Sequence, residues 1–230
     1  MIQFLHELSA FLRGSIREGV RGNRYYYLWI ALLITLLLWG GIAYMDQFDE
    51  GLRVTAMRDQ VSWGFYIGNF TFLVGVAAAA IMLVIPAYVY HWKPIREIVI
   101  MGELLAIAAI LMCLLFVTVD MGRPDRFLHL VVALNFPESM LAWDVVVLNG
   151  YFILNLVIVT YLLYKAFCRK PYSKKIVLPL VLLSIPAAVS IHTVTAFLYN
   201  GFPSRPFWNA SILAPRFIAS AFCSGPSFII

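Results

Sequence analysis

"IVIMGELLAIAAILMCLLFVTV", Ile98 to Val119, decides the fold, because it contains one ionisable side chain, Glu103, and is otherwise almost entirely apolar. A helix needs about 20 residues to cross the hydrocarbon core of a bilayer, and this stretch is long enough. The next ten residues, "DMGRPDRFLH", hold five ionisable side chains: Asp120, Arg123, Asp125, Arg126 and His129. The pattern predicts a transmembrane helix that ends abruptly at a polar surface.

The rest of the chain repeats the apolar pattern. Hydrophobic residues make up 62% and charged residues 13% of the sequence, against about 45–50% and about 25% in soluble domains. Membrane-length stretches occupy residues 25–45, 65–90, 98–119, 145–164 and 176–199, and an incomplete sixth covers 215–230. These runs do not alternate in polarity as membrane strands do. We therefore predict an all-α integral membrane protein, with one transmembrane domain over residues 1–230 and an arm at 1–24. We also expect the polypeptide to continue past Ile230.

The flanking charges predict how the helices are oriented. Lys and Arg gather on the side of residues 1–24, 93–96 and 165–175, whereas most acidic residues fall on the other side. By the positive-inside rule, this distribution predicts a multi-pass protein of the cell inner (cytoplasmic) membrane with a cytoplasmic N-terminus. The net charge of +5 is then a topological signal, so the lipid bilayer is expected as a partner and nucleic acid is not. The acidic outer face is the expected place for chemistry.

Cysteine and histidine spacing limits the possible cofactors. Cys113, Cys168 and Cys223 lie singly, so we predict no iron–sulfur cluster and no metal site of the chain's own, because such sites need clustered ligands. A haem b would need axial histidines from facing helices, and only His129 and His192 would both lie near the outer face. A haem b cytochrome subunit remains an alternative, as do an ion or solute transporter and a purely structural role for the polar groups.

Polar side chains from five predicted helices fall at one depth near the outer face. Ionisable groups in membrane segments are costly unless they pair or line a cavity, so a set at one level predicts a polar pocket. The set consists of Tyr66, Asn69, Asp120, Asp144, Asn149, His192 and Arg216.

Three ionisable residues, two from this set and Glu103 nearer the inner face, have two interpretations each. His192 either hydrogen-bonds a neighbouring helix or exchanges a proton with a bound redox molecule. Asp120 either forms an interfacial ion pair with Arg123 or exchanges protons. The segment that follows, residues 126–143, is expected to act as a pocket lid. Glu103 either snorkels to the inner interface or is an inner station of a proton path to Asp120, roughly 25 Å along the helix.

Several motifs resemble a known family. "WGFYIGNFTFLVGVAAAA" (63–80), "DMGRPDRFLHL" (120–130), "LNFPESMLAWDVVVLNGYFILN" (134–155), "IHTVTAF" (191–197) and "ILAPRFIASAFCSG" (212–225) resemble the NrfD/polysulfide reductase membrane-subunit family. The similarity is greatest to the branch found in the Dsr and Hme transmembrane complexes of sulfite reduction. It covers most of the chain from Trp63 onward.

The resemblance implies a function, a site and partners. Members bind quinone or quinol, with menaquinone as one candidate, toward the outer face beside a ferredoxin-like iron–sulfur subunit, with other membrane and cytochrome subunits in one anaerobic respiratory complex. By position, His192 and Asp120 would be the protonatable (catalytic) residues, and Glu103 would belong to a proton path. The residues expected around the quinone are Tyr66, Asn69, Arg123, Asp144, Asn149 and Arg216. The family is longer than this chain, which fits the expectation that the polypeptide continues.

Overall fold

The computed structural model describes residues 2–58, 60–61, 63–77, 83–133, 135–202 and 205–229, with side chains at all of these except 2–5, 97, 130 and 131. The described chain is mostly helical, and its one β feature is an isolated bridge between Arg58 and Val61. The longer helices are α1 (Ile2–Val20), α2 (Arg24–Glu50), α3 (Phe65–Ala77), α5 (Lys93–Asp120), α7 (Met140–Phe167), α8 (Lys174–Asn200) and α9 (Leu213–Ser227). The short ones are η1 (Gly51–Val54), the π-helix η2 (Ile85–Val89), η3 (Pro124–Arg126), α6 (His129–Val132) and η4 (Pro206–Trp208).

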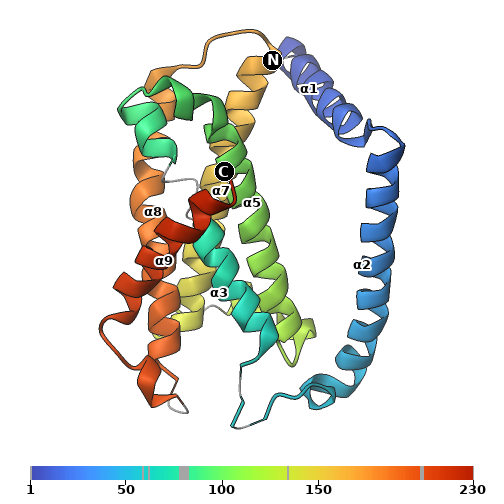
Figure 1. Ribbon diagram of the computed structural model, residues 1–230, viewed down its shortest axis with the longest axis vertical. Coiled ribbons are helices and arrows are strands. Elements are labelled where there is room, and N and C mark those ends of the chain that lie inside the picture. Colours follow the sequence, from blue (N-terminus) through green and yellow to red (C-terminus); the bar gives the residue numbers. More distant parts are fainter. Residues whose placement is uncertain are drawn as a thin grey trace.

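Five helices form a bundle, shown in Figure 1, in which α3 packs on α5, α7 on α5 and α8, and α9 on α3 and α8. Four described helical segments are long and apolar enough to cross a membrane, namely Arg24–Val54, Ile98–Asp120, Met140–Phe167 and Lys174–Asn200. The predicted fold class, an all-α membrane protein, is confirmed. The predicted span 65–90 contains α3 and η2, but residues 78–82 between them lie outside the described residues.

Each bundle helix buries one face and leaves the other exposed, as expected for a helix with lipid on its outer side. On α8 the buried positions Val177, Val181, Ser184, Ala188, Ile191 and Thr195 recur every three or four residues. The buried side chains form two clusters. One surrounds Phe70, Ile110 and Tyr151, and the other surrounds Val99, Ile158 and Val181.

The N-terminal arm forms a helix that the sequence analysis did not predict. Phe11 of α1 is buried with its ring against Tyr164 and Phe167 of α7, at centroid distances of 5.8 and 5.6 Å. The Tyr164 hydroxyl donates to Glu7 at 2.9 Å, and Lys170 lies 3.9 Å from the same carboxylate. These contacts tie α1 to the end of the bundle that is uppermost in Figure 1, which we call the α1 end.

Helix α2 runs apart from the bundle along most of its length (Figure 1), and none of its most apolar stretch is buried. Gln47, near its C-terminus, is the exception. The Gln47 side-chain amide donates to the Val119 carbonyl at 2.8 Å and accepts from the Tyr66 hydroxyl at 2.9 Å. This amide therefore joins α2 to α5 and α3 at the end of the bundle opposite α1.

Candidate functional site

A groove of about 630 Å³ opens between α3, α8, η4 and α9. Because these elements lie far apart in sequence, the groove exists only once the bundle has formed. Its volume falls within the range of about 300–1,000 Å³ that is usual for small-molecule sites. The groove is lined by Gly68, Thr71, Phe72, Val74, Gly75, His192, Tyr199, Phe207, Trp208, Leu213, Arg216, Phe217, Ser220 and Ser224.

His192 contributes a buried ring nitrogen without a partner to this groove. The side chain is only 2% exposed, and its Nδ1 lies 2.8 Å from the Ala188 carbonyl oxygen one turn earlier on α8. A carbonyl can only accept, so Nδ1 carries the hydrogen and Nε2 of the neutral ring is an acceptor. No described protein group hydrogen-bonds Nε2. A buried acceptor left unpaired is costly, so this atom is suited to meet a ligand hydroxyl.

Two hydroxyl groups, those of Thr71 and Tyr199, line the same groove. Tyr199 near the end of α8 and Thr71 of α3 share a hydrogen bond, and the Thr71 hydroxyl also lies 2.9 Å from the Ile67 carbonyl oxygen. Sequence reasoning missed Thr71 and Tyr199, although both lie on the helices expected to form the pocket.

Aromatic rings form one wall of the groove. The Trp208 ring lies 4.9 Å from that of Tyr199, and Phe217 packs against Tyr199 at 5.6 Å. Trp63 stands behind them, 5.1 Å from Tyr199. These three contacts are edge-to-face, so the rings give the groove an apolar aromatic wall. The spacing of the tryptophans along the chain gives no sign that Trp63 and Trp208 gather around Tyr199.

Arg216 is the predicted site residue that joins His192 in the groove. It lies in the first turn of α9, is exposed, and has no carboxylate partner among the described side chains. The guanidinium therefore brings an unneutralised positive charge to the mouth of the groove.

Other predicted residues lie outside the groove. Tyr66 donates to Gln47, and Asn69 and Asn149 donate to carbonyls one turn earlier on their own helices. Asp144 is buried between α7 and α8, where its carboxylate accepts a hydrogen bond of 2.8 Å from Thr195. These side chains support the bundle around the groove and do not line it.

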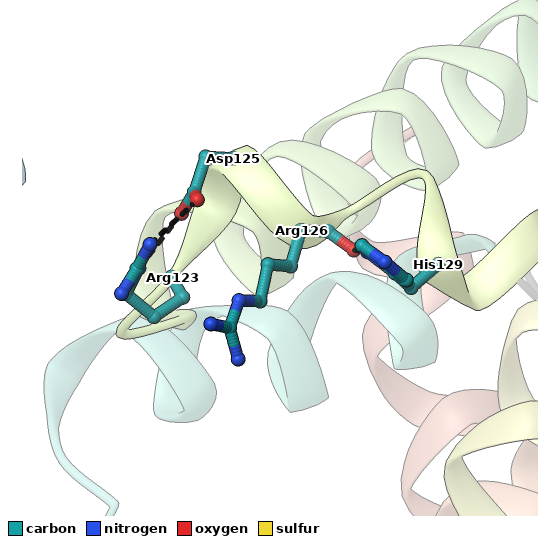
Figure 2. Close-up of polar contacts among 4 residues, drawn as sticks. All are labelled: Arg123, Asp125, Arg126 and His129. Atoms are coloured by element: carbon teal, nitrogen blue, oxygen red, sulfur yellow. Dashed lines mark hydrogen bonds and ion pairs between the residues drawn. The ribbon is translucent and has the colours of Figure 1, made fainter.

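The segment after Asp120 differs from expectation. Arg123 does not pair with Asp120. Its guanidinium donates to both carboxylate oxygens of Asp125, at 3.0 and 2.8 Å (Figure 2), because the tight turn through Gly122 and Pro124 brings these two side chains together. That guanidinium holds the pKa of the Asp125 carboxyl below its ordinary value. Asp120 keeps one buried carboxylate oxygen without a partner among the described groups.

The expected lid is also wrong. None of the described residues from 121 to 143 lines the groove, because its walls come from α3, α8, η4 and α9. His129 is exposed on α6 with its Nδ1 3.3 Å from the Arg126 carbonyl oxygen, so it does not join His192 in the groove. The histidine pair that a haem would need is therefore not brought together there.

Glu103 is buried deep in the bundle. It is 1% exposed, and neither carboxylate oxygen has a partner among the described groups. The snorkelling interpretation is therefore wrong, because the carboxylate does not reach a surface.

The bundle and its groove define a class, a multi-pass helical membrane protein with a ligand-sized site at one end. The chain belongs to the NrfD polysulphide reductase family, because the family described as "Polysulphide reductase, NrfD" matches residues 53–230. The family resemblance of the sequence motifs is thereby confirmed.

The chain also resembles several curated proteins. It is 27% identical to a protein of Halobacterium salinarum assigned as a membrane subunit of a dimethyl sulfoxide reductase, over 88% of this chain and 50% of that protein. It is 28% identical to a polysulfide reductase polypeptide of Wolinella succinogenes, over 73% and 56%. It is 22% identical to an Hdr-like menaquinol oxidoreductase integral membrane subunit of Archaeoglobus fulgidus, over 89% and 49%. The chain thus spans about half the length of these relatives.

Proposed function

We propose that this chain is the quinone- or quinol-reactive membrane subunit of a respiratory electron-transfer complex, with the groove as its site. The observation that carries the proposal is the unpartnered Nε2 of His192, which is buried and lines a groove of ligand size. The relatives named as a menaquinol oxidoreductase subunit and as a polysulfide reductase polypeptide support the same role.

The arrangement suits quinol oxidation. A quinol gives up two protons and two electrons, and each proton leaves a ring hydroxyl. His192 Nε2 would accept a hydrogen bond and then the proton from one hydroxyl. The Thr71 and Tyr199 hydroxyls would bond the second ring oxygen and pass its proton to water at the open side of the groove, while the Trp208 and Phe217 rings enclose the apolar body. The electrons pass to a partner, because we assign this chain no redox centre of its own.

The finer assignments follow from the family resemblance. We propose menaquinone as the quinone, a ferredoxin-like iron–sulfur subunit at the outer face as the electron partner, and further membrane and cytochrome subunits in the same complex. Sulfur- or sulfite-linked anaerobic respiration, as in the Dsr and Hme branch, is the proposed setting. The cytoplasmic N-terminus expected from the charge distribution would place the α1 end inside and the groove at the outer face of the inner membrane.

Glu103 and Asp120 are proposed as two stations of a proton path along α5. Both carry buried carboxylate oxygens with no described partner, and they lie at different depths of one helix. Ionisable groups held in this way inside a membrane protein are typical of proton relays. Asp144 lies on the neighbouring helix α7, close to the Asp120 end of such a path.

The test is quinone-site occupancy in the purified complex. A fluorescent quinol-analogue inhibitor is titrated into wild type, His192→Ala and His129→Ala, the last being a matched loss of a histidine outside the groove. We expect saturable quenching in wild type and His129→Ala, and none in His192→Ala. Absence of saturable quenching in the intact wild-type complex would overturn the proposal. A Soret band that shifts on reduction would instead favour the haem alternative.

A further inference from the structure

A second, small hollow of about 30 Å³, with two cationic side chains in its wall, lies at the α1 end, at the opposite end of the bundle from the groove. Its lining includes Tyr88, His91, Arg96, Tyr172, Lys174 and Leu178. At His91 it adjoins a wider hollow of about 600 Å³ lined by Trp92 and Lys93, among others. The walls come from η2, the start of α5 and the start of α8, so residues more than 80 positions apart meet here.

Two cations in this hollow are fixed by neighbouring side chains. The Arg96 guanidinium donates to the Tyr172 hydroxyl at 2.9 Å and lies 5.7 Å from the centre of the Tyr172 ring. Lys174 Nζ donates to His91 Nε2 at 3.2 Å, and His91 Nδ1 lies 3.1 Å from the Val89 carbonyl oxygen. Each cation therefore has a defined position and still has free N–H donors.

The described part of the hollow holds no carboxylate to neutralise these charges. Glu7 of α1, also at this end of the bundle, is engaged by Tyr164 and Lys170. Neither Arg96 nor Lys174 takes part in an ion pair among the described side chains. Two positioned cations with spare donors recognise an anion, and a phosphate oxygen accepts such hydrogen bonds well.

The surroundings indicate that the anion belongs to a lipid. The side chains of Tyr90 and Trp92 beside the hollow are 76% and 57% exposed, as is usual for rings at the headgroup level of a membrane. From the hollow, exposed Leu178 and Leu182 continue along one face of α8 into its membrane-spanning part. An acyl tail fits along this stripe while its headgroup stays at the cations.

We propose that the mouth of this small hollow between η2, α5 and α8, where it meets the wider hollow at His91, binds the phosphate of an anionic phospholipid headgroup, with one acyl tail along Leu178 and Leu182. Basic pockets between transmembrane helices are used in this way by other membrane proteins. Because none of these residues lines the groove, the lipid site does not depend on the proposed quinone chemistry. Its consequence would be structural, since one lipid would join η2 and α5 to α8.

The test measures lipid binding by native mass spectrometry of the detergent-purified complex. Phosphatidylglycerol and phosphatidylcholine are titrated into wild type, the double variant Arg96→Gln/Lys174→Gln, and the double variant Arg17→Gln/Lys175→Gln. The last pair removes the same charge from exposed positions of α1 and α8 outside the hollow. Loss of two phosphate contacts should weaken phosphatidylglycerol binding about tenfold or more, while the control variant changes it less than about twofold.

Four outcomes would overturn the proposal. An equal loss in the control variant would mean general attraction to a basic surface. Equal binding of phosphatidylcholine would remove the role of charge. Displacement of phosphatidylglycerol by an equal concentration of inorganic phosphate would make this a site for free anions. The charge-preserving variant Arg96→Lys/Lys174→Arg separates the loss of charge from a loss of fold, because it should retain selective binding of phosphatidylglycerol. Loss of that selectivity in a folded complex would also contradict the proposal.

Discussion

The groove at His192 and the segment from Asp120 to His129 both carry ionisable side chains, but they differ in burial and in hydrogen-bond partners. In the groove a ring nitrogen is buried and has no described protein partner. In the segment, Arg123 and Asp125 lie in solvent and satisfy each other (Figure 2). A buried unpaired group retains its full capacity to bind a ligand, whereas an exposed pair is already neutralised and screened. The difference identifies the groove as the better candidate site, although sequence reasoning grouped both regions together.

The largest expected effect is on quinol oxidation in His192→Ala. Removing a group that accepts the substrate proton should lower the rate by about a hundredfold. Stopped-flow oxidation of a water-soluble quinol by the intact complex measures this rate. His129→Ala, in the exposed segment, should leave the rate within about twofold. If the two variants lose activity equally, the contrast between the two regions fails.

Glu103→Gln should separate proton movement from electron transfer. The amide keeps the shape of the side chain but cannot release a proton, so proton uptake by the complex in liposomes should fall about tenfold while quinol oxidation continues. A pH-indicator dye inside the liposomes reports the uptake. Glu7→Gln at the α1 surface is the matched control, and unchanged proton uptake in Glu103→Gln would remove this residue from the proposed path.

Thr195→Val should affect stability more than catalysis. The change removes the donor to buried Asp144 at nearly constant volume, so it should cost about 1–3 kcal/mol of unfolding free energy. Thermal unfolding in detergent, followed by intrinsic fluorescence, gives the comparison. Ser190→Ala, which removes an exposed hydroxyl bonded to a backbone carbonyl, should change the midpoint little. A stability equal to wild type in Thr195→Val would show that Asp144 finds another donor.

The smallest effect is expected for Asp125→Asn. The Arg123 guanidinium lowers the pKa of Asp125, so the pair contributes above the ordinary pKa of the carboxyl and is lost as pH falls through the lowered value. At neutral pH the pair is formed, but solvent screens it, and the variant should unfold at the same temperature as wild type. A clear decrease in that temperature would mean that this segment supports the bundle.

The sequence by itself determined the fold class. Runs such as 98–119 are too long and too apolar for a soluble helix, and the bilayer allows few other structures for them, so length and composition were sufficient. Composition did not predict α1, because this helix is amphipathic and is fixed by the contacts of Phe11 and Glu7 with α7. Nor did it predict that Gln47 would join α2 to the bundle.

The identity of the site required the tertiary structure. Position along the predicted helices placed His192, Asp144, Asn149 and Asp120 at one depth in the membrane. The structure brings only His192 of these four into the groove. Depth along a helix follows from counting residues, but the direction in which a side chain points depends on how the helix is rotated against its neighbours. That rotation is set by packing between α3, α8 and α9, which no single stretch of sequence encodes. The sequence therefore determined which residues are available, and the packing of the bundle decided which of them meet.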